Sequence, residues 1–148
     1  MKRKKIMFVC TGNTCRSPMA EALLRSKIKK NKIKWWDVAS CGIHAEVGGS
    51  ISRNSELALQ EVGISADKFK PRQLTEKLVK SSVLVVCMTA RHKQALSQYD
   101  NVISVPDIMG VEAPDPYGMD IEAYRQSRDL LSTVCDLIIE KFIKKYQE

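Results

Sequence analysis

The sequence predicts a three-layer α/β fold in which helices cover both faces of a parallel β-sheet. Three observations lead to this prediction. Short apolar runs alternate along the chain with segments of helical periodicity, as in strands joined by crossover helices. The 148 residues suit one domain, expected to span residues 1–148. Hydrophobic residues make up 44% and charged residues 28% of the chain, which supports a buried core and excludes a disordered protein.

Four apolar runs are the expected strands. The continuous run at 6–9 is typical of a strand that is buried on both faces of a sheet. The run at 83–88 is the strongest, because it is continuous and rich in β-branched residues. Two shorter runs, at 36–40 and 102–105, complete a four-stranded sheet.

About five helices are expected around these strands. Ser17-Pro18 opens the first, because the N–H that proline lacks would have no partner there anyway. Gly63 is the expected C-terminal cap of a helix at 54–62. The last helix, at 121–145, carries one apolar face. The other helices are expected at 74–80 and 90–97, and loops at 41–50 and 106–118.

The net charge of +7 raises the question of a polyanionic partner. Four of the positive charges stand at residues 2–5, which leaves +3 for the rest of the chain. We interpret this cluster as a solvated basic terminus and expect neither nucleic acid nor a membrane as a partner. The run at 6–9 is too short for a signal peptide, and no run approaches the roughly 20 residues of a membrane span. We therefore expect a cytoplasmic protein.

Five cysteines are too few for a disulfide scaffold, and their odd number rules out a complete set of disulfides. In the cytoplasm we expect them to be mostly reduced. Cys41, Cys87 and Cys135 fall on expected strands or on a helix face, and we interpret them as core residues. Cys10 differs, because it directly follows the first strand.

The loop at 10–17 suits phosphate chemistry. In doubly wound folds, ligands bind beyond the carboxyl ends of the strands, where this loop is expected. Backbone N–H groups in such a loop can form an anion-binding nest next to the positive end of the following helix. Gly12 and Asn13 tolerate the left-handed backbone that the loop requires. The planar fork of Arg16 can hold two phosphate oxygens.

Cys10 is the candidate nucleophile of this loop. A helix N-terminus and a neighbouring cation lower the pKa of a cysteine, so that a thiolate can attack phosphorus at neutral pH. Ser17 is expected to donate its hydroxyl to the sulfur. Asp115, flanked by two prolines, is the candidate general acid and then base, and Tyr117 is expected at the pocket rim. A lone cysteine at a strand end is more often a small buried hydrophobe, but the combination of motifs argues against chance.

Residues 9–21 resemble the signature loop of the low-molecular-weight protein tyrosine phosphatases. The Asp-Pro-Tyr triplet at 115–117 resembles the general-acid loop of that family, and Ser-Cys-Gly at 40–42 resembles its Ser-Ala-Gly segment. Residues 87–89 and 92–93 resemble its Met-Thr and His-Lys segment. The resemblance covers nearly the whole chain. It implies a four-stranded sheet in the order 2-1-3-4 and phosphocysteine catalysis without a metal or other cofactor.

Carried over by position, the family's roles fall mainly on the first loop. Cys10 is the nucleophile, Arg16 the phosphate binder, and Asp115 the general acid and then the base. Asn13 and Ser17 shape the loop and stabilise the thiolate. The expected substrate-binding residues are Thr11, Gly12, Asn13, Thr14, Cys15, Ser17 and Tyr117.

The residue at position 11 helps to distinguish between phosphoarginine and phosphotyrosine as the substrate. Tyrosine-directed members usually carry a bulky leucine or isoleucine here, whereas threonine resembles the bacterial protein-arginine phosphatase branch. A small polar Thr11 can meet the N–H groups of phosphoarginine, and Asp115 could orient the guanidinium and protonate the leaving nitrogen. We expect a monomeric phosphatase that acts on phosphoarginine in proteins. The alternative is a tyrosine phosphatase in which Thr11 is a neutral variation.

Cys15 corresponds to a second loop cysteine of the family. It could trap an oxidised Cys10 as a reversible disulfide, or be a small packed side chain. No role is predicted for His44 or His92. A thiol-dependent arsenate reductase is disfavoured, because the later cysteines form no close pair that could relay a disulfide. The complete catalytic set disfavours a non-catalytic phosphate-binding module.

Overall fold

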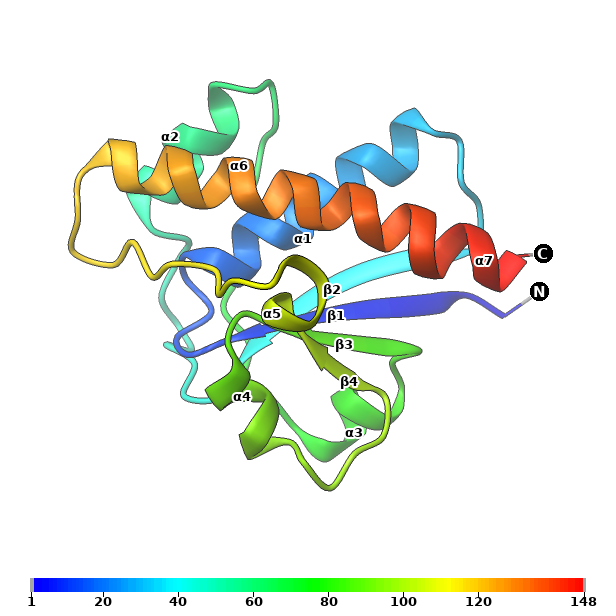
Figure 1. The fold of residues 1–148 in the computed structure, drawn as a ribbon. Coiled ribbons are helices and arrows are strands. Elements are labelled where there is room, and N and C mark those ends of the chain that lie inside the picture. The colour runs from blue at the N-terminus through cyan, green and yellow to red at the C-terminus, as the bar shows by residue number, and fades with distance from the viewer. Residues whose placement is uncertain (1, 148) are drawn as a thin grey trace.

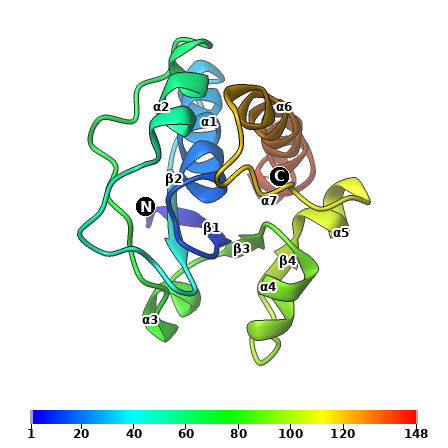
Figure 2. The ribbon, with the colours of Figure 1, turned by 90° about the vertical axis from the view of Figure 1, so that its left-hand side faces the viewer.

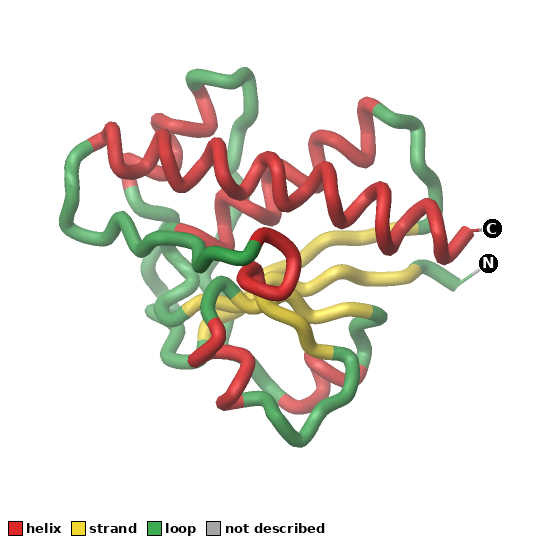
Figure 3. The backbone as a smooth tube through the Cα atoms, in the orientation of Figure 1, coloured by secondary structure: helices red, strands yellow, loops and turns green. Residues whose placement is uncertain are grey.

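The computed structural model describes residues 2–147, in which a parallel sheet lies between two layers of helices (Figures 1 and 3). The sheet has the order β2-β1-β3-β4, which confirms the predicted fold class and strand order. The strands are β1 (Lys4–Cys10), β2 (Trp36–Gly42), β3 (Leu84–Cys87) and β4 (Val102–Ser104). The helices are α1 (Arg16–Lys30), α2 (Arg53–Gln60), α3 (Glu76–Lys80), α4 (Ala90–Ala95), α5 (Val105–Met109) and α6 (Ile121–Ile138), followed by a π-helical segment (Ile139–Ile143) and α7 (Lys144–Gln147).

The side chains of β1 divide between two hydrophobic cores. Ile6 and Phe8 are fully buried in the core that the sheet forms with α1 and α6. Met7 and Val9 are fully buried on the opposite face, towards α3 and α4. Alternate residues of a strand point to opposite faces. A central strand covered on both faces therefore explains the continuous apolar run of the sequence.

Helix α5 was not expected, because the segment at 106–118 was predicted to be a loop. The Ser104 hydroxyl accepts a hydrogen bond from the Asp107 N–H at 3.3 Å, and the Asp107 carboxylate accepts one from the Ser104 N–H at 2.8 Å. This reciprocal pair is a capping box. Pro106 suits the first turn, and Gly110 ends the helix with a φ of 77°. The prolines therefore mark a helix start as well as a loop.

Gly63 caps the end of α2 as the sequence predicts. It adopts a φ of 77°, in the left-handed region. Its N–H donates to the carbonyl of Gln60, and the N–H of Ile64 donates to the carbonyl of Leu59. This pair of hydrogen bonds is the Schellman motif, which satisfies carbonyls that would otherwise lack partners at the helix end.

The first and last helices differ in detail from expectation. Helix α1 begins at Arg16, so Pro18 is its third residue rather than its first. The final helical run starts at 121 as predicted but contains a π-helical segment at 139–143 before α7. Within residues 2–147, no helix combines the length and the apolar character needed to cross a membrane.

The carboxyl ends of β1, β2 and β3 meet at one edge, which Figure 2 shows from the front. Cys10 pairs in register with Gly42 at the ends of β1 and β2. The backbone continues this pairing past the strands, because the N–H of Ile43 donates to the carbonyl of Cys10 at 3.0 Å. In the sheet, β2 lies on one side of β1 and β3 on the other. The loop after β1 therefore lies at the switch point of the strand order, where doubly wound folds bind ligands.

Candidate active site

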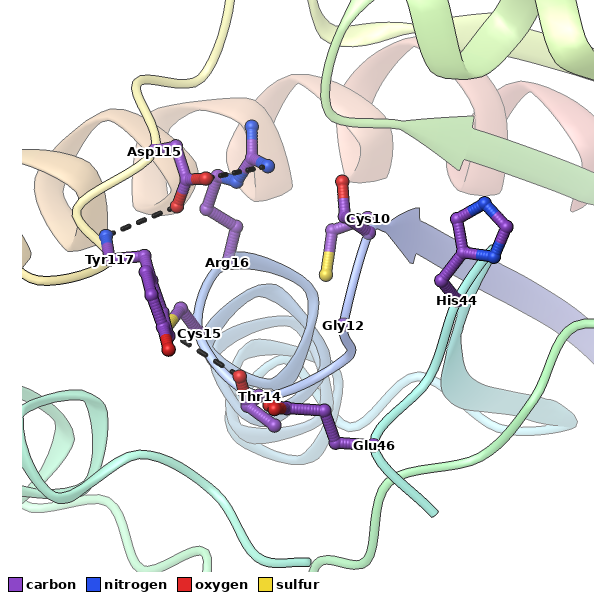
Figure 4. A pocket seen from close by; sticks show the side chains of 10 residues that line it. Cys10, Gly12, Thr14, Cys15, Arg16, His44, Glu46, Asp115 and Tyr117 are labelled. Atoms are coloured by element: carbon purple, nitrogen blue, oxygen red, sulfur yellow. Dashed lines mark hydrogen bonds and ion pairs between the residues drawn. The ribbon is translucent and has the colours of Figure 1, made fainter.

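A cavity of about 280 Å³ opens beyond the carboxyl end of β1 (Figure 4). Its lining includes eight residues that the sequence predicts for the site: Cys10, Thr11, Gly12, Thr14, Cys15, Arg16, Asp115 and Tyr117. His44 and Glu46 also line it and were not predicted. Asn13 and Ser17, which were predicted to bind substrate, are fully buried and do not line the cavity. Their contacts support the loop.

The buried amide of Asn13 joins three segments of the chain. Its Oδ1 accepts a hydrogen bond from the backbone N–H of Arg72 at 2.8 Å, which identifies the other amide atom as the nitrogen. That nitrogen donates to the Ser17 hydroxyl at 2.7 Å and to the Ser40 hydroxyl at 3.0 Å. The single Ser17 proton is thus free for the Cys10 sulfur, which lies 2.8 Å away. The network therefore makes Ser17 a donor to Cys10, as the sequence predicts.

Only one of the two residues expected in the left-handed region is found there. Asn13 has a φ of 59°, whereas Gly12 is not among the residues of positive φ. Close approach of the backbone instead constrains Gly42, which ends β2. A Cβ at this position would lie 2.5 Å from the carbonyl oxygen of Thr11 and 3.0 Å from the backbone nitrogen of Asn13. The small residue that the loop requires therefore belongs to the neighbouring strand.

Burial raises the pKa of the Cys10 thiol, contrary to the lowering that the sequence suggests. The residue is only 3% exposed, so a thiolate there loses its hydration. The Ser17 hydroxyl, the backbone N–H groups of Ser17 and Asn13 and the charge of Arg16 all act in the opposite direction. The predicted stabilising groups are therefore in place, but the cost of burial exceeds their combined effect.

Arg16 connects the first loop with the loop that carries Asp115. Its side chain is 6% exposed, and its Nη1 donates to the carbonyl of Ala113 at 3.1 Å. Its Nη2 lies 3.6 Å from the carboxylate of Asp115, which is 54% exposed (Figure 4). The other carboxylate oxygen of Asp115 accepts the N–H of Tyr117 at 3.1 Å. A phosphate in the loop would thus have a guanidinium and a carboxyl group beside it.

The segment after β2 follows the first loop closely. The N–H of His44 donates to the carbonyl of Thr11 at 2.9 Å, and that of Glu46 donates to the carbonyl of Gly12 at 3.1 Å. These bonds place both side chains at the pocket wall (Figure 4). The sequence gives no local signal for this contact, because the composition of residues 41–50 predicts only an irregular loop and not what that loop packs against.

His92, for which no role was predicted, contacts the first loop from α4. Its Nε2 lies 2.9 Å from the Thr11 hydroxyl oxygen. Burial and the charge of Arg16 lower the pKa of His92 to about 4, so the ring is neutral at pH 7. The His-Lys segment that matched the family pattern was the available signal for this residue.

The remaining cysteines are buried and free. Cys41, Cys87 and Cys135 have no exposed surface, which confirms their place in the core. Cys15 lines the pocket, and its sulfur lies 3.7 Å from the hydroxyl of Tyr124. A disulfide between Cys15 and Cys10 stays a prediction. Among residues 2–147, no three histidine, cysteine, aspartate or glutamate side chains gather as they would around a metal ion.

The close approach at Gly42 predicts that Gly42→Ala displaces the first loop. The added methyl group meets backbone atoms, which cannot rotate away, so we expect roughly 1–3 kcal/mol of lost stability and weaker binding of inorganic phosphate. Urea unfolding and calorimetric titration with phosphate measure the two effects. Gly63→Ala is the control: it does not line the pocket and its Cβ would meet no atom within 4 Å, so its positive φ should cost stability while phosphate affinity is unchanged. Unchanged phosphate affinity in Gly42→Ala would contradict the constraint.

The direction of the hydrogen-bond network predicts the effect of Asn13→Asp. A carboxylate cannot donate to Ser17, and it attracts the Ser17 proton away from Cys10 while adding negative charge. Both changes raise the Cys10 pKa, so alkylation of Cys10 by iodoacetamide at neutral pH should slow about tenfold. Mass spectrometry of the Cys10 peptide across a pH series measures this. Ser40→Ala, which leaves the bond between Ser17 and Cys10 in place, should have a smaller effect; an equal effect would refute the inferred direction.

Comparison with known proteins agrees with this geometry. Residues 5–148 match the family described as low molecular weight phosphotyrosine protein phosphatase. A protein-arginine-phosphatase of Bacillus subtilis (strain 168) is 40% identical to this chain over 134 residues, which cover 85% of this chain and 88% of the relative.

Two solved structures show the same fold. One is an arginine phosphatase, YwlE, in a cysteine-to-serine mutant with a phosphorylated active-site serine; it has 36% identity and a TM-score of 0.86, and the match covers 93% of this chain and 97% of that one. The other is a low molecular weight protein tyrosine phosphatase from T. tengcongensis, with 36% identity, a TM-score of 0.88 and coverage of 94% and 99%. This chain therefore belongs to the low-molecular-weight phosphotyrosine protein phosphatase family and is a phosphatase.

Proposed function

We propose that this phosphatase hydrolyses phosphoarginine in proteins through a phosphocysteine formed on Cys10. The observation that carries the choice of substrate is Thr11, which directly follows the nucleophile in the chain and lines the same pocket. The B. subtilis relative is a protein-arginine-phosphatase, and YwlE is an arginine phosphatase. The tyrosine phosphatase from T. tengcongensis, at the same identity as YwlE, makes tyrosine the alternative substrate.

In the first step, the Cys10 thiolate attacks phosphorus and the P–N bond breaks. Asp115 donates a proton to the leaving nitrogen, so that arginine departs with a complete guanidinium. Guanidine is a much more basic leaving group than a phenolate, with a pKa of roughly 12.5–13.8 against about 10, so this proton transfer is essential. Arg16 and the backbone N–H groups of the loop hold the phosphoryl oxygens during transfer.

In the second step, water attacks the phosphorus of phosphocysteine and the P–S bond breaks. The Asp115 carboxylate accepts the proton of the water, and Cys10 returns to the thiolate as phosphate leaves. The Ser17 hydroxyl stabilises the departing sulfur. The YwlE mutant with a phosphorylated serine in place of its active-site cysteine supports a covalent intermediate at this position.

The charges around the pocket also favour a cationic leaving group. Glu46 and Asp115 line the cavity in addition to the phosphate-binding Arg16. A carboxylate repels the phosphate dianion, but it attracts a guanidinium. Phosphotyrosine has no such cation, and therefore gains nothing from the Glu46 carboxylate; Asp115 is protonated when it acts as the acid of the first step and adds no charge at that stage.

The proposal extends to the protein as a whole. Residues 1–148 act as one domain, in the cytoplasm and as a monomer, on phosphorylated proteins and not on nucleic acid. Part of the basic cluster is engaged within the molecule, because Arg3 pairs with Asp37 at 2.8 Å and Lys4 lies over the ring of Tyr146. Cys15, which lines the same pocket as Cys10, serves as the redox partner that protects an oxidised Cys10.

The covalent mechanism predicts that Cys10→Ser loses turnover but keeps its phosphate site. A serine hydroxyl at this position is a far weaker nucleophile, so kcat should fall by about 10³-fold or more. Release of phosphate from a phosphoarginine peptide measures turnover, and calorimetry with inorganic phosphate is the control for an intact site. Turnover close to that of the parent protein would exclude the phosphocysteine.

The choice of substrate is tested with two peptides of the same sequence, one carrying phosphoarginine and the other phosphotyrosine. We expect a higher kcat/KM for phosphoarginine. Thr11→Ile should shift the ratio of the two kcat/KM values by about tenfold towards tyrosine, because the hydroxyl is lost and apolar bulk is added. A preference for phosphotyrosine that Thr11→Ile leaves unchanged would establish the alternative.

A further inference from the structure

The contact between Thr11 and α4 joins residues that are 81 positions apart. The Nε2 of His92 lies 2.9 Å from the Thr11 hydroxyl oxygen, within hydrogen-bond distance. Thr11 is exposed at the cavity, whereas His92 is 7% exposed. His92 is not among the residues that line the cavity, and it contacts the site through its hydrogen bond with Thr11.

The second ring nitrogen of His92 indicates which atom carries the proton. Its Nδ1 is buried and, among residues 2–147, has no hydrogen-bond partner. A proton on Nδ1 would bury an unpaired N–H, which folded proteins avoid more strictly than an unpaired acceptor. With the proton on Nε2, the ring donates to Thr11 and only a lone pair stays unpaired.

This assignment determines what Thr11 can offer to a substrate. A threonine hydroxyl has one proton and two lone pairs. When one lone pair accepts the proton of His92, the hydroxyl proton and the other lone pair are free to face the cavity. Thr11 can then donate to a phosphoryl oxygen and accept from an N–H of the substrate at the same time.

We propose that His92 is a positioning residue for phosphoarginine, which holds the Thr11 hydroxyl so that it bridges the phosphoryl group and the guanidinium of the substrate. This inference rests on the proposed function. Phosphoarginine has N–H groups next to phosphorus, so it can accept the Thr11 proton at a phosphoryl oxygen and donate an N–H to the Thr11 lone pair. Phosphotyrosine has no N–H there, so an oriented lone pair on Thr11 contributes nothing to its binding.

Nearby charges and the start of α4 keep the His92 ring neutral and in position to donate to Thr11. The charged groups that act on His92 are Arg16, Glu112 and Asp115, of which Arg16 opposes a positive charge on the ring. A neutral ring has one donor and one acceptor, which the bridge requires. The Thr89 hydroxyl accepts the backbone N–H of His92 at 3.2 Å and caps α4, so the helix start also places the ring.

The first test uses the ratio of kcat/KM for the phosphoarginine peptide to that for the phosphotyrosine peptide. His92→Leu removes the donor and should lower this ratio about fivefold, the worth of one neutral hydrogen bond. His92→Gln, which retains an N–H donor on a side chain of similar reach, should restore most of it. Gln94→Leu, on the same helix and outside the cavity lining, is the matched control. An unchanged ratio in His92→Leu would overturn the proposal.

A double-mutant cycle asks whether His92 acts through Thr11. Thr11→Val removes the hydroxyl while keeping the shape, and His92→Leu should change the ratio no further in that background. An equal fall in both backgrounds would overturn the proposal. If the parent protein prefers phosphotyrosine and Thr11→Val leaves the ratio unchanged, the proposed function itself fails, and this proposal fails with it.

A second measurement needs no variant. The nitrogen chemical shifts of the His92 ring, from long-range proton–nitrogen correlation NMR of the folded parent protein, distinguish the two neutral tautomers. The proposal requires the proton on Nε2. A proton on Nδ1 would mean that Thr11 donates its own proton to His92, which would overturn the bridge even if the phosphoarginine preference is found.

Discussion

The pocket depends on the buried amide of Asn13, which contacts three segments of the chain that are far apart in the sequence. The side chain accepts from the backbone at Arg72 and donates to Ser17 on α1 and Ser40 on β2. An amide suits this position because it combines an acceptor with two donors, and because asparagine tolerates the left-handed φ of 59° found here. An apolar residue would leave buried polar partners unsatisfied, at about 1–3 kcal/mol for each.

The same network explains how a buried thiol can serve as a nucleophile. Burial opposes the thiolate, while a directed hydroxyl, backbone N–H groups and one guanidinium favour it. These groups are held in place before the reaction, so they need not reorganise when negative charge develops. Dry surroundings also strengthen each of these interactions. The loop therefore combines a high cost of ionisation with strong stabilisation of the charge as it moves from sulfur to phosphate.

Most of the fold and of the site could be predicted because their signals are local. The four apolar runs identify the strands, and the first loop is one continuous segment that ends in Arg16. Helix α5 also has a local signal, the capping box, which the neighbouring prolines obscured. His44 and Glu46 could not be found in this way, and the family pattern marked His92 without indicating its contact with Thr11, because these contacts depend on how distant segments meet after folding. For the same reason, the sequence suggested the charge around Cys10 but not the extent of its burial.

Arg16 connects phosphate binding in the first loop with proton transfer by Asp115 in the second. Its ion pair with Asp115 spans 3.6 Å to a carboxylate that is half exposed, and such pairs contribute little on their own. The buried hydrogen bond from Arg16 to the Ala113 carbonyl is shorter, and it attaches to the backbone two residues before the acid. The position of Asp115 is therefore set mainly through its own chain, with the flanking prolines limiting its movement. A guanidinium can hold this carbonyl with one N–H and still present others to phosphate, whereas the single ammonium of a lysine lacks the planar fork that serves both. The residue that binds the phosphoryl group thus also places the acid that completes its transfer.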